Sequence, residues 1–207
     1  MDMDILDKLF GSGAKVRILK LFLMNPDRAF DPAMVAERAM VSIGITRKEL
    51  RNLDRIGFIK RQFFTKEIKK QKNRTIVSAK KKTPGWTLEK KFPYMETLES
   101  FLSNVNPFKH KDVIEKISRT GKVNLLIISG VFIKYEDARV DLLVVGDGIK
   151  MGALEDIVKT IESEMGEEVR YTVFETSEFN YRLSLFDKLI RDILDFPHEK
   201  IINKLGI

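Results

Sequence analysis

Asp141 has the sequence setting of a metal-binding carboxylate. It opens the apolar run "DLLVVG", and Gly130 closes an earlier apolar run that starts at Val123. A carboxylate at the start of a strand can ligate Mg²⁺, which takes oxygen ligands, and a glycine lets a phosphate approach the backbone. A second acid two residues away would project from the same side of the strand. Arg139 occupies that position, so the pattern is incomplete.

The arginine at position 139 opposes metal binding. At an effective dielectric of about 20, a unit positive charge about 4 Å from a divalent cation repels it by roughly 8 kcal/mol. The chain has no cysteine, and its two histidines, His110 and His198, lie far apart in the sequence. Thiolate and histidine metal sites are therefore not expected. We predict no catalytic residue, no bound metal and no cofactor.

Positive charge is concentrated in one segment. The chain carries a net charge of +7, and residues 60–91 contain twelve Lys or Arg and two Glu, a net charge of +10. Such a concentration is the electrostatic footprint of a phosphate-binding surface. A flexible solvated loop is the alternative.

Local signals predict short helices followed by strands in the first ninety residues. Ser12 and Asp31 are suited to cap helices, and Pro32 fits a first helical position. A third helix is expected to follow Ser42 and to end at Gly57, which favours the left-handed conformation. After it, "FIKRQFF" and "GWTLEKK" indicate two strands joined by a long basic connector.

The third predicted helix has an apolar face and a basic face. Thr46, Leu50 and Leu53 have the spacing of an inward-facing stripe. The residues left facing outward are Arg47, Lys48, Arg51, Asn52 and Arg55. A solvated helix face without a partner is the alternative interpretation.

This order of elements resembles a winged helix-turn-helix domain, over roughly residues 6–88. The resemblance rests on two packed helices, the segment "RKELRNLDRIGFIKR" and a basic hairpin. It implies that the third helix enters the DNA major groove and that the hairpin follows the phosphate backbone as a wing. The residues assigned to DNA are Ser42, Arg47, Lys48, Arg51, Lys66, Lys69, Lys70, Lys72, Arg74, Lys80, Lys81 and Lys82.

The second half of the chain alternates helices with apolar strands. "VNLLIIS" and "VDLLVVG" are continuous apolar runs, typical of strands buried on both faces. A helix is expected over residues 151–165, followed by a strand in "EVRYTVFE". Two terminal helices are predicted, "RLSLFDKLIRDILD" and "HEKIINKL".

The segments "SGVF", "RVDLLVVGD" and "EFNYRLSLFDKLIRDIL" resemble the minimal nucleotidyltransferase domain of the DNA polymerase beta superfamily. The resemblance covers about residues 108–205. That family carries Gly-Ser after its first strand, Asp-x-Asp at the start of the second strand and a third carboxylate on a later strand. These groups bind the nucleotide phosphates and the metal ions.

The match to this pattern is partial. Gly130 and Asp141 fit, but Val131 replaces the serine, Arg139 replaces the first aspartate, and residues 170–172 hold no carboxylate. The resemblance therefore implies a degenerate site made of Gly130, Arg139 and Asp141. An ion pair between Arg139 and Asp141 would fill the metal space, or Arg139 would hold a phosphate or nucleotide.

We expect a two-domain chain of the α+β or α/β class. Residues 1–91 would form a winged helix of three helices and a β-hairpin wing, and residues 92–107 a connector helix and linker. Residues 108–207 would form a small mixed-sheet, nucleotidyltransferase-like domain with flanking helices. The 92–105 helix or the C-terminal helices would supply a homodimer interface.

The expected function is binding of double-stranded DNA as a cytoplasmic regulator of transcription. No apolar run reaches the length needed to cross a bilayer. Two alternatives stay open. One is an active nucleotidyltransferase that uses Asp141, Asp137 and Glu168 as metal ligands, and the other is an antitoxin-like interaction protein.

Overall fold

The computed structural model describes residues 2–72, 75–102 and 111–207, with side chains for residues 5–67, 80–102 and 113–207. The chain divides into two compact units. Unit 1 comprises residues 1–105 with the short stretch 163–166, and unit 2 comprises residues 106–162 and 167–207. Helices and strands occur in both, so the fold is mixed α+β. Within the described ranges, no helix combines the length and the apolar character needed to cross a bilayer.

Unit 1 begins with helices, two of which start at a residue whose side chain caps the helix. These helices are α1 (Asp2–Phe10), α2 (Gly13–Leu23), α3 (Pro32–Arg38) and α4 (Ile43–Arg55). Ser12 caps α2 by accepting a hydrogen bond from the Lys15 amide, and Asp31 caps α3 by accepting one from the Met34 amide. Gly57 follows α4 with a φ of 77°. The predicted helix starts and the left-handed stop are confirmed.

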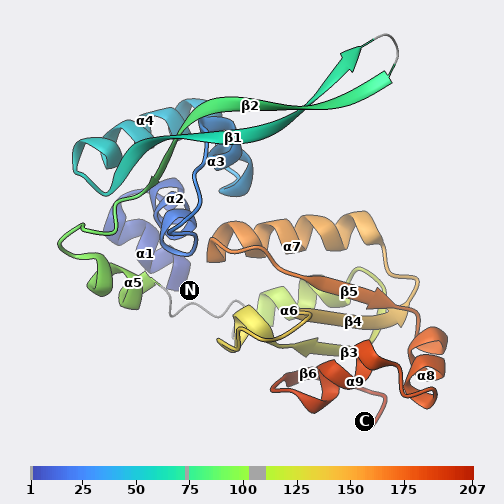
Figure 1. Ribbon diagram of the computed structural model, residues 1–207. Coiled ribbons are helices and arrows are strands. Elements are labelled where there is room, and N and C mark those ends of the chain that lie inside the picture. Colours follow the sequence, from blue (N-terminus) through green and yellow to red (C-terminus); the bar gives the residue numbers. More distant parts are fainter. Residues whose placement is uncertain (1, 73–74, 103–110) are drawn as a thin grey trace. The chain divides into compact units, whose positions relative to one another are not determined.

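A long antiparallel hairpin follows α4. It consists of β1 (Ile59–Lys72) and β2 (Thr75–Leu88), paired without a break from Ile59 opposite Leu88 to Lys72 opposite Thr75. The described residues of the basic connector, up to Lys72 and from Thr75 onward, are therefore part of the ladder. Phe30 and Trp86 exchange two backbone hydrogen bonds of 2.9 Å at the base of the hairpin. Its far end projects beyond the helices of unit 1 (Figure 1).

The core of unit 1 also takes up the helix that follows the hairpin. This helix, α5 (Met95–Leu102), buries Leu102 in the cluster that contains Phe22 and Leu50, and Met95 and Leu98 pack against the same cluster. The sequence indicated a connector or dimer interface here. These three residues of α5 therefore pack inside unit 1, and the homodimer interface stays a prediction.

A four-stranded mixed sheet forms the centre of unit 2, in the order β5-β4-β3-β6. The strands are β3 (Lys122–Ile128), β4 (Leu142–Asp147), β5 (Tyr171–Phe174) and β6 (Glu199–Asn203). β4 is antiparallel to β3 and parallel to β5, and β6 is antiparallel to β3. Helices α6 (Lys111–Ser118) and α7 (Met151–Met165) lie on one face of the sheet, and α8 (Thr176–Ser184) and α9 (Lys188–Asp195) pack on the other (Figure 1).

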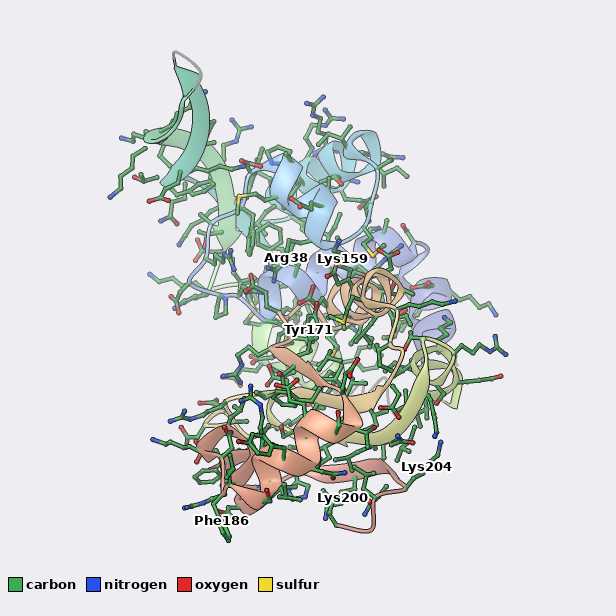
Figure 2. All side chains as sticks on the ribbon, turned by 90° about the vertical axis from the view of Figure 1, so that its right-hand side faces the viewer. Arg38, Lys159, Tyr171, Phe186, Lys200 and Lys204 are labelled. Atoms are coloured by element: carbon green, nitrogen blue, oxygen red, sulfur yellow. The ribbon has the colours of Figure 1, made fainter. Side chains whose placement is uncertain are left out.

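The C-terminal part of unit 2 differs from the prediction at two places. "HEKIINKL" forms the edge strand β6 rather than a helix, because Ile202 pairs with Leu126 of β3 and the ladder outweighs local helix preference. "RLSLFDKLIRDILD" forms two helices, because Phe186 adopts a φ of 53° and Asp187 caps α9 through the amides of Leu189 and Ile190. The Phe186 side chain points outward at this bend (Figure 2).

Candidate functional site

Helix α4 presents a basic face to solvent. Thr46, Leu50 and Leu53 are buried, as their spacing predicted, and Glu49 is buried beside them. The exposed cations of the helix are Arg47, Lys48, Arg51 and Arg55. In the part of the chain that the structure describes, the side chains of these four residues form no hydrogen bond or ion pair. Ser42 is exposed just before the helix and makes no side-chain cap bond, so this face is free to meet a ligand.

The base of the hairpin lies beside α4 (Figure 1). Arg61 of β1 donates to the carboxylate of Asp54 on α4 at 3.4 Å. Alternate residues of a strand share one side, so Phe63 follows Arg61 on this side of the hairpin. Lys82 lies across the ladder from Thr65, two residues further along. The hairpin side linked to α4 therefore carries an aromatic ring and cations.

Phe63 is a functional candidate that the sequence patterns did not single out. Phe63 is 64% exposed, and Lys82 Nζ lies 5.3 Å from the centre of its ring. Phe64, its neighbour, faces the opposite side of the ladder and is half-buried against Gly85. The adjacent phenylalanines of "FIKRQFF" were the available signal, because two consecutive residues of a strand cannot both face the core.

The predicted wing cations fall into three groups. Lys80, Lys81 and Lys82 are exposed. Lys66 instead forms a 2.7 Å ion pair with Asp31, the residue that caps α3. The side chains of Lys69, Lys70 and Lys72, and the whole of Arg74, lie outside the described residues.

The ion pair of Lys66 has a structural role. Burial disfavours the ionised Asp31 carboxyl, but the hydrogen bonds from Lys66 and from the Met34 amide outweigh burial and lower the pKa of Asp31 below its ordinary value. The Lys66 ammonium thus holds the hairpin to the start of α3. It is not free for a phosphate while this pair persists.

In unit 2, Asp141 lies fully buried at the start of β4, with 0% of its surface exposed. Its Oδ1 accepts hydrogen bonds from the Val131 amide at 3.1 Å and from Arg170 Nη2 at 2.9 Å. Its Oδ2 accepts bonds from the Arg170 amide at 2.8 Å and from Arg170 Nε at 3.0 Å. Both carboxylate oxygens are therefore engaged by protein donors, and two of the four bonds come from one guanidinium.

Gly130 makes room for this arrangement. Its φ of 54° lies in the left-handed region, and an added Cβ would overlap Oδ1 of Asp141. The Val131 amide, which follows it, points at the same oxygen. The Val131 amide of this loop therefore donates to an internal carboxylate and is not free to bind a phosphate.

The prediction of an ion pair between Arg139 and Asp141 is wrong. Arg139 Nε instead contacts Asp192 Oδ2 of α9 at 2.8 Å. Arg170 takes the place beside Asp141 because it precedes β5, the parallel neighbour of β4, and the Asp141 amide donates to the Arg170 carbonyl at 2.7 Å. The sequence had one signal for this: an arginine stands in the region where the resemblance placed a third carboxylate.

Hydrogen bonding to Asp141 raises the pKa of Arg170 above its ordinary value, against the opposing effect of partial burial. An arginine guanidinium is protonated throughout the physiological pH range, and this hydrogen bonding favours its charged form further. A divalent metal at Asp141 would have to displace this cation. Asp137 and Glu168, the other carboxylates considered for a metal, are both exposed.

A cavity of about 510 Å³ opens along β5 and over the start of α7. Tyr171, labelled in Figure 2, contributes to its wall, and its charged lining residues, Glu175 and Glu178, are both acidic. Carboxylates repel phosphate, so this lining does not favour a nucleotide. Within the described residues, no three His, Asp or Glu side chains are grouped as a metal site requires.

The chain has no match among protein-family models, among curated proteins or among solved structures.

Proposed function

We propose that the chain binds duplex DNA through α4 and the β1–β2 hairpin, in the manner of a winged helix, and regulates transcription. The observation that carries the proposal is the exposed, unpaired basic face of α4 next to a hairpin that carries exposed lysines. A helix of this kind fits the major groove, and its arginines can pair with phosphates or with guanine.

The charge distribution supports the same partner. Residues 60–91 carry a net charge of +10, more than the +7 of the whole chain. A cationic ribbon beside a cationic helix neutralises DNA phosphates and releases counterions, which is the main source of non-specific affinity for duplex DNA. The Lys66–Asp31 pair removes one cation from this set and anchors the ribbon.

For unit 2 we propose an inactive nucleotidyltransferase-like domain that serves assembly or ligand sensing. Its support is the Asp141 carboxylate, which accepts two hydrogen bonds from the Arg170 side chain and lies in a fully buried position. An active enzyme would need that carboxylate for Mg²⁺. Incubation with labelled nucleotide and Mg²⁺ or Mn²⁺ tests this directly: transfer of label to protein or nucleic acid would show an active enzyme.

DNA binding is tested by a salt series with a fluorescent duplex of mixed sequence. Binding is expected to weaken steeply with salt. In the triple variant Lys80→Ala, Lys81→Ala, Lys82→Ala, the slope of the logarithm of the association constant against the logarithm of the salt concentration should become shallower by about 2–3. Each phosphate that the variant no longer neutralises changes this slope by roughly 0.9.

A charge-matched control is available in unit 2. The variant Lys116→Ala, Lys150→Ala, Lys188→Ala removes three exposed lysines that lie outside the proposed interface. Its slope should equal that of the wild type. Equal slopes for all three proteins would rule the hairpin out as a DNA contact, and no binding at low salt would remove the proposal altogether.

A further inference from the structure

The first turn of α4 carries an unusual combination of residues, "IGI" at positions 43–45. Ile43 is 42% exposed and Ile45 is 47% exposed, although both are apolar. They flank Gly44, the second residue of the helix. This turn therefore offers solvent two isoleucines and no side chain between them.

The fold of unit 1 does not require a glycine at position 44. Its φ lies outside the left-handed region, and an added Cβ would meet no atom within 4 Å. Glycine in a helix is less favourable than alanine, because it loses more conformational freedom on folding. The fold of unit 1 therefore leaves the surface at Gly44 open to a partner that approaches the helix from outside.

The position of Gly44 on the helix indicates what approaches. Gly44, Lys48, Arg51 and Arg55 are spaced four, three and four residues apart, which places them along one face of α4. This face is opposite the buried stripe, and its three cations are exposed. The glycine thus lies in line with the charges that attract a polyanion, at the end of the helix that comes nearest to bases in a helix-turn-helix complex.

We infer that the first turn of α4 reads thymine in the major groove through the 5-methyl group. Gly44 would let the helix approach the base edges closely, and Ile43 and Ile45 would contact the methyl groups on either side. The 5-methyl group of thymine is an apolar group on the major-groove edge of a base pair, so it is the feature that exposed isoleucines would recognise. The inference rests on the proposed DNA binding and adds a preferred base.

The inference is tested by removing the methyl group from the DNA alone. The probes are a duplex of alternating dA and dT and the same duplex with dU in place of dT, which keeps every hydrogen-bonding group. Each contacted methyl should contribute about fourfold in affinity, because burying one such carbon group stabilises by about 0.8 kcal/mol. The wild type should therefore prefer dT, and the double variant Ile43→Ala, Ile45→Ala should bind both duplexes alike.

The matched control for the isoleucines is Ile56→Ala. Ile56 lies at the opposite end of α4 and is 61% exposed, so its replacement removes a similar exposed side chain and should keep the dT preference. Equal wild-type affinity for dT and dU duplexes would overturn the inference while leaving DNA binding intact. Absence of binding to either duplex would instead refute the proposed function.

Gly44→Ala gives an independent test with two readouts. Trp86 is the only tryptophan of the chain and packs against the core of unit 1, so its fluorescence during urea unfolding reports on that unit. The urea midpoint should stay the same or rise, because alanine lowers the entropy of the unfolded chain. Affinity for the dA·dT duplex should fall by about tenfold, which is roughly what one interaction with a base edge contributes.

Gly152→Ala is the control for this substitution. Gly152 is also the second residue of its helix, α7, and an added Cβ there meets nothing within 4 Å. Its replacement should leave DNA affinity unchanged. Wild-type affinity in Gly44→Ala would overturn the role of Gly44, and so would a lowered urea midpoint, because the glycine would then be required by the fold.

Discussion

Removal of the Arg170 side chain should destabilise unit 2 far more than removal of a similar arginine nearby. Arg170→Ala deletes two of the four hydrogen bonds to Asp141, and it leaves this carboxylate, which is fully buried in the wild type, without its cation. Removing one partner of a buried ion pair costs about 3–5 kcal/mol. Because the Arg170 side chain is 51% exposed, water can replace part of the interaction, and we expect the free energy of unfolding to fall by about 3 kcal/mol.

Arg139→Ala is the matched control. The Arg139 side chain is 55% exposed, and its partner Asp192 is 20% exposed rather than fully buried. Pairs that water can reach contribute about 0.2–1 kcal/mol, so this variant should lose little. The two arginines thus differ mainly in the burial of the acid that each one contacts.

The assay is urea unfolding followed by circular dichroism and by Trp86 fluorescence on the same samples. Trp86 belongs to unit 1, whereas circular dichroism reports on the helices and strands of both units. A loss confined to unit 2 therefore shifts only the part of the dichroism change that comes from unit 2, and the fluorescence transition stays in place. The double variant Asp141→Ala, Arg170→Ala should lose less than the sum of the two single variants, with a coupling of about 2 kcal/mol. Equal small losses for Arg170→Ala and Arg139→Ala, or additive single losses, would refute the buried-pair argument.

Three further predictions concern single features of the two units. The Asp31 carboxyl has a lowered pKa in the folded chain, so its stabilisation is complete above its unfolded pKa of about 3.9 and is lost as the pH falls through the folded value. When the pH falls from about 5 to about 2, the free energy of unfolding, followed by Trp86 fluorescence, should decrease less in Lys66→Met than in the wild type. An identical pH profile for the two proteins would contradict the ion pair. Gly130→Ala should lower the apparent Tm of unit 2 because the new methyl group overlaps Asp141, whereas an unchanged melting curve would show that the loop adjusts freely. Phe63→Ala should leave stability unchanged, because the ring is largely exposed, but should weaken DNA binding several-fold by anisotropy, since an aromatic ring among cations can pack against bases or sugars; wild-type affinity would exclude the ring from the interface.

The hairpin has a consequence for how the chain would bind DNA. A ladder that is continuous over all fourteen residues of each strand keeps the described lysines on a fixed ribbon rather than on a mobile loop. Such cations lose less conformational freedom on binding, which favours affinity. The anchors of the ribbon are local to unit 1: Lys66 contacts Asp31, and Arg61 contacts Asp54 of α4.

The site in unit 2 has a different logic. Arg170 lies in the region where the resemblance to nucleotidyltransferases implies a third carboxylate. It donates to Asp141, the aspartate that fits the family pattern. Replacing both members of a buried ion pair is often tolerated, whereas replacing one is costly. Asp141 and Arg170 therefore depend on each other, which would maintain the pair in the absence of any catalytic role.

Several features could be predicted from the sequence because they depend on residues close together in the chain. Ser12 and Asp31 accept hydrogen bonds from amides three residues later. Gly57 ends α4 through its own backbone freedom, and the buried stripe of α4 follows from the helical period. The basic character of residues 60–91 is likewise a property of composition alone.

Other features depended on which distant segments meet, and only the tertiary structure decided them. "HEKIINKL" becomes a strand because β3 offers it a partner, and Lys66 leaves the set of free cations because Asp31 lies beside it. Asp141 pairs with Arg170, twenty-nine residues away, rather than with Arg139, two residues away. Parallel strands bring their starting residues together, whereas no local rule states which of two arginines reaches a buried carboxylate. Helix caps and the helical repeat depend on residues close together in the chain, whereas the pairing of charges in a core is set by the topology of the sheet.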